Sequence, residues 1–182
     1  ILGLLAAFVD SSFGQGFGML TPILIILGFD PIVVVPVILL SQMLAGFSGT
    51  IFHSIYGNVE LDSSEKKDVK VTLLFTITGM IGMIFAVMLA VNLREWFVML
   101  YIGIMIILVG IIMLGKARFK FSWTKLYIIS GIASFNKAIS GGGYGPIATS
   151  GQLLSGREHD EAVAVTSFSE AFLSGFGFLL YL

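Results

Sequence analysis

The sequence contains no cysteine and only two histidines among its 182 residues, and charged residues make up only 12% of it. Without cysteine the chain forms no disulfide and offers no thiolate ligand or nucleophile. Two histidines are too few for a histidine-rich metal cluster. The low charge content and the net charge of −1 exclude a disordered chain and a basic nucleic-acid-binding surface. We expect no metal site, no cofactor and no nucleic-acid partner.

What the sequence contains instead is apolar surface. Apolar residues make up 57% of the chain and the mean hydropathy is +1.00, whereas soluble domains average about 45–50% apolar and about 25% charged residues. Most charged residues gather in clusters at 60–70, 94–95, 116–125 and 157–161. Four stand alone: Asp10, Asp30, Lys137 and Glu170. This pattern predicts an all-α integral membrane protein, because the clusters mark loops between uncharged stretches.

The uncharged stretches predict about six transmembrane helices. A helix needs about 20 apolar residues to cross the hydrocarbon core. The continuous helices are expected at 31–59, 71–93, 96–115 and 160–182, and glycine and proline break two further segments, 1–29 and 126–156. Lysine and arginine lie near 66–70 and 116–125, so the positive-inside rule makes these loops cytoplasmic. We expect a multi-pass protein of the inner (cytoplasmic) membrane, with 116–125 as a cytoplasmic linker.

The two broken segments resemble each other. Each has a glycine cluster a few residues before a proline, Pro22 or Pro146. Farther along, a constant offset of 128 pairs several identical residues and sets Gln42 opposite Glu170. These pairs are Gly28 with Gly156, Val35 with Val163, Ser41 with Ser169 and Gly49 with Gly177. The pattern predicts a first repeat at 1–115 and an incomplete second repeat at 126–182, and such repeats are typical of secondary transporters.

The direction of each broken segment decides how the repeats are related. Segments 1–29 and 126–156 are long enough to cross the membrane once even with an unwound middle. Single crossings make the repeats parallel, and re-entrant hairpins make them inverted. We expect single crossings.

The glycine clusters are the candidate substrate site. Glycine runs unwind a helix, and proline is favourable at the start of a new one, so helices are expected to begin near Pro22 and Pro146. Unwound N–H groups and a helix N-terminus carry partial positive charge and suit an oxyanion. The candidate binding residues are Gly14, Gln15, Gly16, Gly18, Thr21, Lys137, Ser140, Gly141, Gly142, Gly143, Tyr144 and Thr149. A competing interpretation is that the glycines only allow close helix packing.

Isolated ionisable residues within spans are functional candidates. Lys137 is expected near the membrane midplane, where it supplies a cation for the substrate, unless it extends to the cytoplasmic edge. Glu170 is a candidate for coupling to protons, alone or paired with Lys137. Asp10 and Gln42 are further candidates for coupling or gating.

At these residues the chain resembles the sulfite exporter TauE/SafE family of membrane permeases. Members carry a duplicated glycine-rich segment that ends in proline, matched here by 14–22 and 141–146. A helix with a Thr-Ser pair follows, matched by Thr166 and Ser167, and the first copy ends in a His-containing stretch and a Gly-Asn-Val-acidic turn, matched by His53 and 57–60. The chain departs from the pattern at Phe52, where a basic residue is usual.

The resemblance implies transport of sulfite, sulfonates or related small organic anions across the cytoplasmic membrane. It also implies about eight spans in two halves, so this chain is expected to lack the last two. An anion channel built on the same broken helices, or a structural membrane subunit, remains an alternative. An enzyme is not expected: Ser48 and His53 resemble an intramembrane protease dyad, but their side chains point about 140° apart on one helix. A homo-oligomer and protons as the coupling ion remain open.

Overall fold

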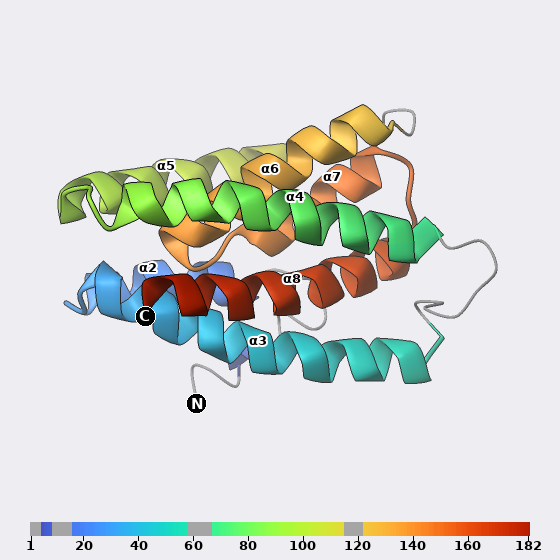
Figure 1. The fold of residues 1–182 in the computed structure, drawn as a ribbon, viewed down its shortest axis with the longest axis horizontal. Coiled ribbons are helices and arrows are strands. Elements are labelled where there is room, and N and C mark those ends of the chain that lie inside the picture. The colour runs from blue at the N-terminus through green and yellow to red at the C-terminus, as the bar shows by residue number, and fades with distance from the viewer. Residues whose placement is uncertain (1–4, 9–15, 58–66, 115–121) are drawn as a thin grey trace.

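The computed structural model describes residues 5–8, 16–57, 67–114 and 122–182, and every regular element within those ranges is helical (Figure 1). After a helical turn at residues 5–8, the elements are α2 (Gly16–Ile26), α3 (Pro31–Ile55), α4 (Lys67–Ala90), α5 (Glu95–Leu114), α6 (Trp123–Ser140), α7 (Tyr144–Leu154) and α8 (His159–Tyr181). Within the described ranges, three helices are long and apolar enough to cross a membrane: Pro31–Ile55, Val69–Ala90 and His159–Tyr181. The expected all-helical membrane protein is confirmed; the count of six spans and the division into repeats stay predictions.

The start of α3 is fixed by local chemistry. The carboxylate of Asp30 accepts a hydrogen bond of 2.9 Å from the backbone N–H of Ile32. Pro31 occupies the first helical position, where a missing N–H costs nothing. The helix therefore begins where its first N–H groups are either satisfied or absent.

The prediction that a helix begins near Pro22 is wrong. Helix α2 begins at Gly16, and Pro22 lies in its interior. In a membrane protein an interior proline is tolerated because neighbouring helices and small backbone adjustments satisfy the freed groups. Asp10, Gly14 and Gln15 lie outside the described residues, so the break expected there stays a prediction.

In the second broken segment, α6 ends at Ser140 and α7 begins at Tyr144, so the interruption falls at the glycine run. The chain then reverses direction. Gly151 of α7 lies beside Ile129 of α6, so close that a Cβ at Gly151 would meet the Ile129 side chain at 2.5 Å. Figure 1 shows α7 returning along α6. The expectation that 126–156 runs once across the bundle is therefore wrong, and the segment is a helical hairpin.

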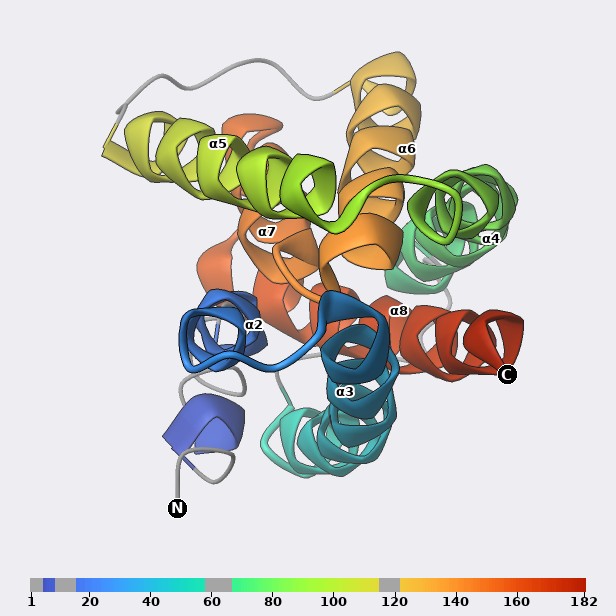
Figure 2. The same cartoon turned by 90° about the vertical axis from the view of Figure 1, so that its left-hand side faces the viewer.

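Helix α8 occupies the middle of the bundle. It packs against α3 and α4, and α4 packs in turn against α6 (Figure 2). Helices α3 and α8 run antiparallel, because Gly46 faces Ala171 while the earlier residue Leu39 faces the later residue Gly177. A Cβ on Gly46 would lie 3.0 Å from Cβ of Ala171, so this glycine permits the close approach of the two helices.

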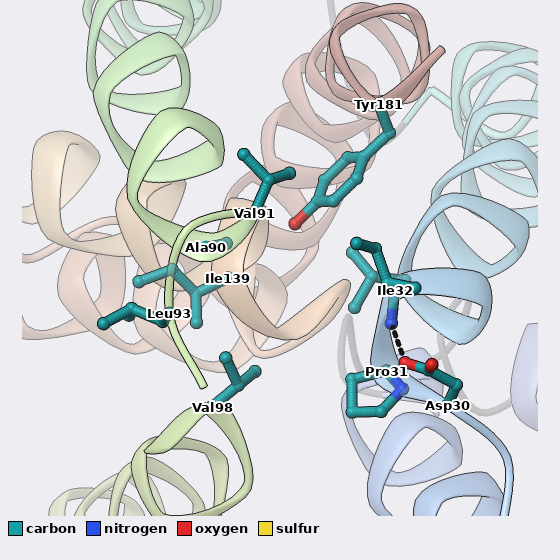
Figure 3. Close-up of a pocket in the computed structure, with 10 residues that line it drawn as sticks. Asp30, Pro31, Ile32, Ala90, Val91, Leu93, Val98, Ile139 and Tyr181 are labelled. Atoms are coloured by element: carbon teal, nitrogen blue, oxygen red, sulfur yellow. Dashed lines mark hydrogen bonds between the residues drawn. The ribbon is translucent and has the colours of Figure 1, made fainter. Parts of the chain in front are cut away.

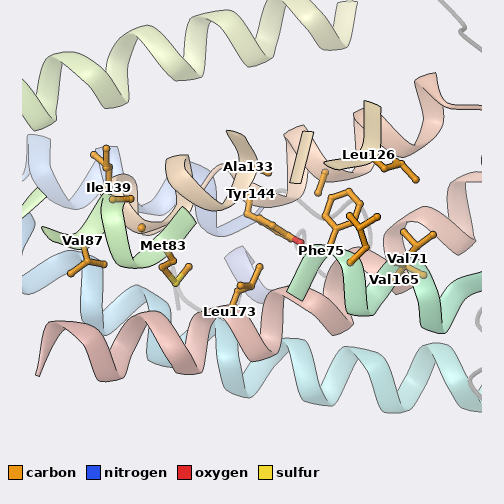
Figure 4. Packing of buried hydrophobic residues seen from close by; sticks show 14 of the residues in the cluster. Val71, Phe75, Met83, Val87, Leu126, Ala133, Ile139, Tyr144, Val165 and Leu173 are labelled. Carbon is orange, nitrogen blue, oxygen red and sulfur yellow. The ribbon is translucent and has the colours of Figure 1, made fainter. Parts of the chain in front are cut away.

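The apolar core lies between α4, α6, α7 and α8 (Figure 4). The Tyr144 ring packs edge-on against Phe75 with the ring centroids 6.3 Å apart. Large apolar side chains also cover the outside of the bundle, including Ile77 at 58% and Phe85 at 68% exposure. A soluble monomer rarely exposes so much contiguous apolar surface, whereas a membrane-embedded bundle does so against lipid.

Candidate functional site

Lys137 is the centre of a buried polar cluster. It lies in the last turn of α6, and its exposure is 0%. Its Nζ donates a hydrogen bond to Oε1 of Gln42 and forms an ion pair of 2.8 Å with Oε1 of Glu170. Gln42 and Glu170 are also buried. Helices α3, α6 and α8 thus each contribute one member of what we call the Lys137 cluster: Lys137, Gln42 and Glu170.

The cluster lies deep within the bundle. Gln42 is near the middle of α3 (Pro31–Ile55), and Glu170 is at the middle of α8 (His159–Tyr181). These two residues are the positions that the repeat offset of 128 sets opposite each other. The structure brings both of them to the same ammonium group.

The electrostatics of the cluster depend on pairing. A buried lysine or glutamate alone pays a desolvation cost of several kcal/mol, which an ion pair with good hydrogen bonds offsets. The 2.8 Å contact supplies that pairing, and Gln42 takes a second hydrogen bond from Nζ. As it stands, the charge of Lys137 is neutralised by Glu170 and is not available to a ligand.

The polar face of α8 extends the cluster. The hydroxyl of Ser174 lies 2.6 Å from the backbone oxygen of Glu170 and 3.5 Å from Oε1 of Gln42. Ser174 follows Glu170 by four residues, and Thr166 precedes it by four, so all three share one helix face. Sequence reasoning did not select Ser174, although this spacing from Glu170 was a usable signal.

Most of the polar groups in the glycine turn after α6 form hydrogen bonds within the turn itself. The Ser140 hydroxyl lies 2.8 Å from the backbone oxygen of Asn136 and 2.7 Å from that of Gly142, and it accepts a hydrogen bond from the Gly142 N–H at 3.2 Å. Gly141 and Gly143 both adopt the left-handed conformation, with φ of +67° and +73°. In this state Ser140 and Gly142 hold the turn together, so their expected role in binding substrate stays a prediction.

The N-terminus of α7 lies beside the Lys137 cluster. Its N-cap residue, Gly143, provides no side-chain hydrogen bond. The first N–H groups of a helix have no acceptor within the helix, and they carry the positive end of its dipole. The first residue, Tyr144, is buried, its ring centroid lies 5.7 Å from Nζ of Lys137, and its hydroxyl is 2.8 Å from the Ser169 hydroxyl. The arrangement places a helix N-terminus beside the Lys137–Glu170 ion pair.

Thr149 lies farther along α7 and joins a different polar group. Its hydroxyl donates to Oγ1 of Thr166 at 3.2 Å, and Nε2 of Gln152 donates to the same oxygen at 2.9 Å. Gln152 also donates to the backbone oxygen of Ala162 at 3.3 Å. Gln152 and Ser169 were not selected from the sequence as site residues, since an isolated Gln or Ser in an apolar helix carries no distinctive pattern.

The candidates in the first broken segment do not join the Lys137 cluster in the described part of the chain. Gly16, Gly18 and Thr21 lie in α2, which packs mainly against α3. Thr21 is buried, and its hydroxyl has no hydrogen-bond partner among the described residues. Asp10 and the pair Gly14 and Gln15 lie outside those residues, so their expected roles stay predictions.

A pocket of about 160 Å³ opens at the end of the bundle where α3 begins and α8 ends (Figure 3). Val35, Ile139 and Tyr181 are among the residues that line it. Tyr181 donates a hydrogen bond of 2.7 Å to the backbone oxygen of Ala138. Ile139 follows Lys137 by two residues, so the pocket lies near the C-terminal end of α6.

Among the described residues, no group of three or more His, Asp or Glu side chains is placed to hold a metal ion. In comparisons with known proteins, the family model described as "Sulfite exporter TauE/SafE" matches residues 1–182, the whole chain. No curated protein and no solved structure matches the chain.

Proposed function

Because the chain belongs to the sulfite exporter TauE/SafE family, whose members are membrane transporters rather than enzymes, we propose that it carries sulfite or an organic sulfonate across the cytoplasmic membrane. The observation that supports this proposal best is the fully buried ammonium of Lys137 beside the N-terminus of α7. Both groups favour a negatively charged ligand, and a sulfur oxyanion accepts hydrogen bonds on every oxygen. The anion binds between Lys137 and the first turn of α7.

The ion pair between Lys137 and Glu170 suggests that anion binding is coupled to the uptake of a proton. With both residues ionised the Lys137 cluster is neutral, so a monoanion would leave a net negative charge in a medium of low dielectric constant. If Glu170 binds a proton, the positive charge of Lys137 remains for the anion. We therefore propose that one proton enters the site with each monoanion, and that Glu170 is the residue that binds it.

The arrangement of α3 and α8 supports an inverted duplication. These helices correspond under the offset of 128, and they run antiparallel through the middle of the bundle. Gln42 and Glu170 occupy equivalent positions and contact the same Nζ. Inverted repeats that meet at a central site are a common basis of alternating access in secondary transporters.

The charged residues at the helix ends indicate how the bundle is oriented in the membrane. Helices α4, α6 and α8 all begin at the same end of the bundle (Figure 1). Lys70 and Lys125 lie there, so the positive-inside rule assigns this end to the cytoplasm. The pocket lined by Val35 and Ile139 lies at the opposite end and gives the anion its entrance or exit on the external side.

Sulfite flux into proteoliposomes tests the proposed function. Wild-type protein should show saturable uptake, and sulfite on the inside should accelerate the uptake of labelled sulfite, as expected for a carrier and not for a channel. Lys137→Met should reduce the flux at least tenfold, because it removes the cation and keeps the volume. The matched variant Lys70→Met removes an exposed lysine near the start of α4 and should transport normally. Absence of saturable flux for sulfite and for small sulfonates would contradict the proposal.

A further inference from the structure

Three side chains in the half of the bundle where α8 begins have a buried polar atom without a hydrogen-bond partner among the described residues. These atoms are Oγ1 of Thr72 and Thr76 on α4, and Oε1 of Gln152 on α7. Gln152 is 0% exposed and Thr72 is 4% exposed. A helical threonine usually bonds to the carbonyl one turn earlier, and buried polar atoms are almost always paired. Buried polar atoms without a partner in the protein usually form hydrogen bonds to bound water.

The packing of α4 against α8 places these atoms relative to Glu170. A Cβ on Gly79 would meet Leu173, and a Cβ on Gly177 would meet Met83. In both contacts the α8 residue follows the α4 residue by 94 positions, so the two helices run parallel in a constant register.

The same register extends one and two turns toward the start of both helices. It sets Thr76 opposite Glu170 and Thr72 opposite Thr166. Residues 72, 76, 79 and 83 share one face of α4 because they recur at helical spacing. The two open hydroxyls of α4 therefore face the polar side of α8 and not the lipid.

On the other side of α8, side chains of α7 and α8 form two hydrogen-bonded groups. Thr149 and Gln152 bond to the Thr166 hydroxyl at 3.2 and 2.9 Å, and the hydroxyls of Tyr144 and Ser169 are 2.8 Å apart. We call these five residues the α7–α8 seam. The seam runs from Tyr144, beside the Lys137 cluster, to Gln152, whose Nε2 bonds to Ala162 near the start of α8.

We propose that the α7–α8 seam, completed by water at the open atoms of Thr72, Thr76 and Gln152, is a proton relay between Glu170 and the cytoplasmic end of the bundle. A relay needs groups that both donate and accept hydrogen bonds, as hydroxyls and water do. The Gln152 amide positions the Thr166 hydroxyl and water but does not pass on a proton itself. The side chains of the seam are in direct hydrogen-bond contact at 2.8 to 3.2 Å, so a sulfur oxyanion does not fit between them. In this relay, water links the bonded groups to each other and to Glu170.

A hydronium ion at the cytoplasmic end gives up a proton and becomes water, and each hydroxyl or water in the relay passes on one proton as it receives another. The carboxylate of Glu170 binds the last proton and becomes a neutral acid. Of the helices packed around Glu170, α6 presents the charged Lys137 and α7 the titratable Tyr144. On α3 the uncharged Gln42 contacts Nζ of Lys137 beside Glu170, and on α4 the register of 94 positions sets the uncharged Thr76 opposite Glu170.

The inference rests on the proposed function, because it serves the coupling step at Glu170, but it is testable without transport. The carboxyl stretching band of Glu170 is measured by infrared spectroscopy on purified wild-type protein and assigned by its absence from Glu170→Gln. After a pH jump, the time course of this band reports how fast Glu170 exchanges protons. Thr166→Val keeps the shape of the side chain and removes the hydroxyl at the centre of the seam.

We expect Thr166→Val to slow the relaxation of the Glu170 band at least tenfold without changing its final amplitude. The matched control is Thr50→Val, since Thr50 is a buried threonine on α3 whose hydroxyl bonds to the Gly46 oxygen of its own helix. Equal relaxation in the two variants would overturn the relay. A Glu170 band that does not respond between pH 4 and pH 9 would overturn it as well. Failure of sulfite flux with a normal Glu170 response would contradict the proposed substrate and leave the relay supported.

Discussion

Lys137 keeps its charge inside the protein because Glu170 lies 2.8 Å away. The ammonium contributes little to stability by itself, since the attraction between the two charges mainly offsets the cost of removing both from water. Its value is positional, because it ties α6 to α8 and, through Gln42, to α3. Removing either charge alone is therefore far more harmful than removing both.

This asymmetry gives a stability prediction. Lys137→Met should lower the free energy of unfolding by about 3–5 kcal/mol, because Glu170 is then buried without its partner. The double variant Lys137→Met with Glu170→Gln should recover most of that loss, since neither side chain is charged. Unfolding by a denaturing detergent, followed by circular dichroism, measures both values. A single variant as stable as Lys70→Met would show that Glu170 does not depend on Lys137.

At the scale of the element, the glycine turn between α6 and α7 determines where α6 ends and how closely the turn packs against α3. Gly141 ends α6 in the left-handed conformation, and its N–H bonds to the Lys137 oxygen at 2.7 Å. It also lies against the backbone of α3: a Cβ there would be 3.2 Å from Cα of Val35. This turn therefore needs glycine for its conformation and again for its packing.

Gly57 has the same left-handed conformation as Gly141 but not its close packing, so it allows the two contributions to be measured separately. Its φ of +72° is close to that of Gly141, but a Cβ there would meet nothing within 4 Å. Gly57→Ala should cost about 1–2 kcal/mol for the left-handed conformation alone. Gly141→Ala should cost about 1–3 kcal/mol more, because the backbone of Val35 must move. Thermal unfolding of both variants in the same detergent measures the difference, and equal costs would refute the packing contribution.

The sequence predicted the break at Gly141–Gly143 because three glycines in a row are unfavourable in a helix. It did not predict the start of α2, because proline marks a helix start reliably only where no neighbouring helix can satisfy the freed backbone groups, and Pro22 lies inside a packed bundle. Lys137 and Glu170 were predicted to be functional because they are charges within apolar spans. The partners Gln152 and Ser169 were not, because only the packing of α7 on α8 gives them a role.

At the scale of the whole molecule, the direction of the chain after the glycine turn was not predictable from its length. A segment of 126–156 is long enough either to cross once or to turn back. The outcome depends on the backbone angles of Gly141 and Gly143 and on the packing of Gly151 against Ile129, none of which leaves a signal in composition. The reversal makes α3 and α8 antiparallel.

Cysteine accessibility tests this topology in the intact membrane, and the native chain has no cysteine to interfere. Single cysteines at Lys70 and Glu158 should react with a membrane-impermeant maleimide from the same side, because the hairpin returns the chain to the end where α4 begins. A cysteine at Asn92, in the turn between α4 and α5, should react only from the opposite side. All three positions are exposed, so burial does not limit labelling. Reaction at Glu158 and Asn92 from one side, with Lys70 on the other, would restore the single crossing and with it a parallel arrangement of the repeats.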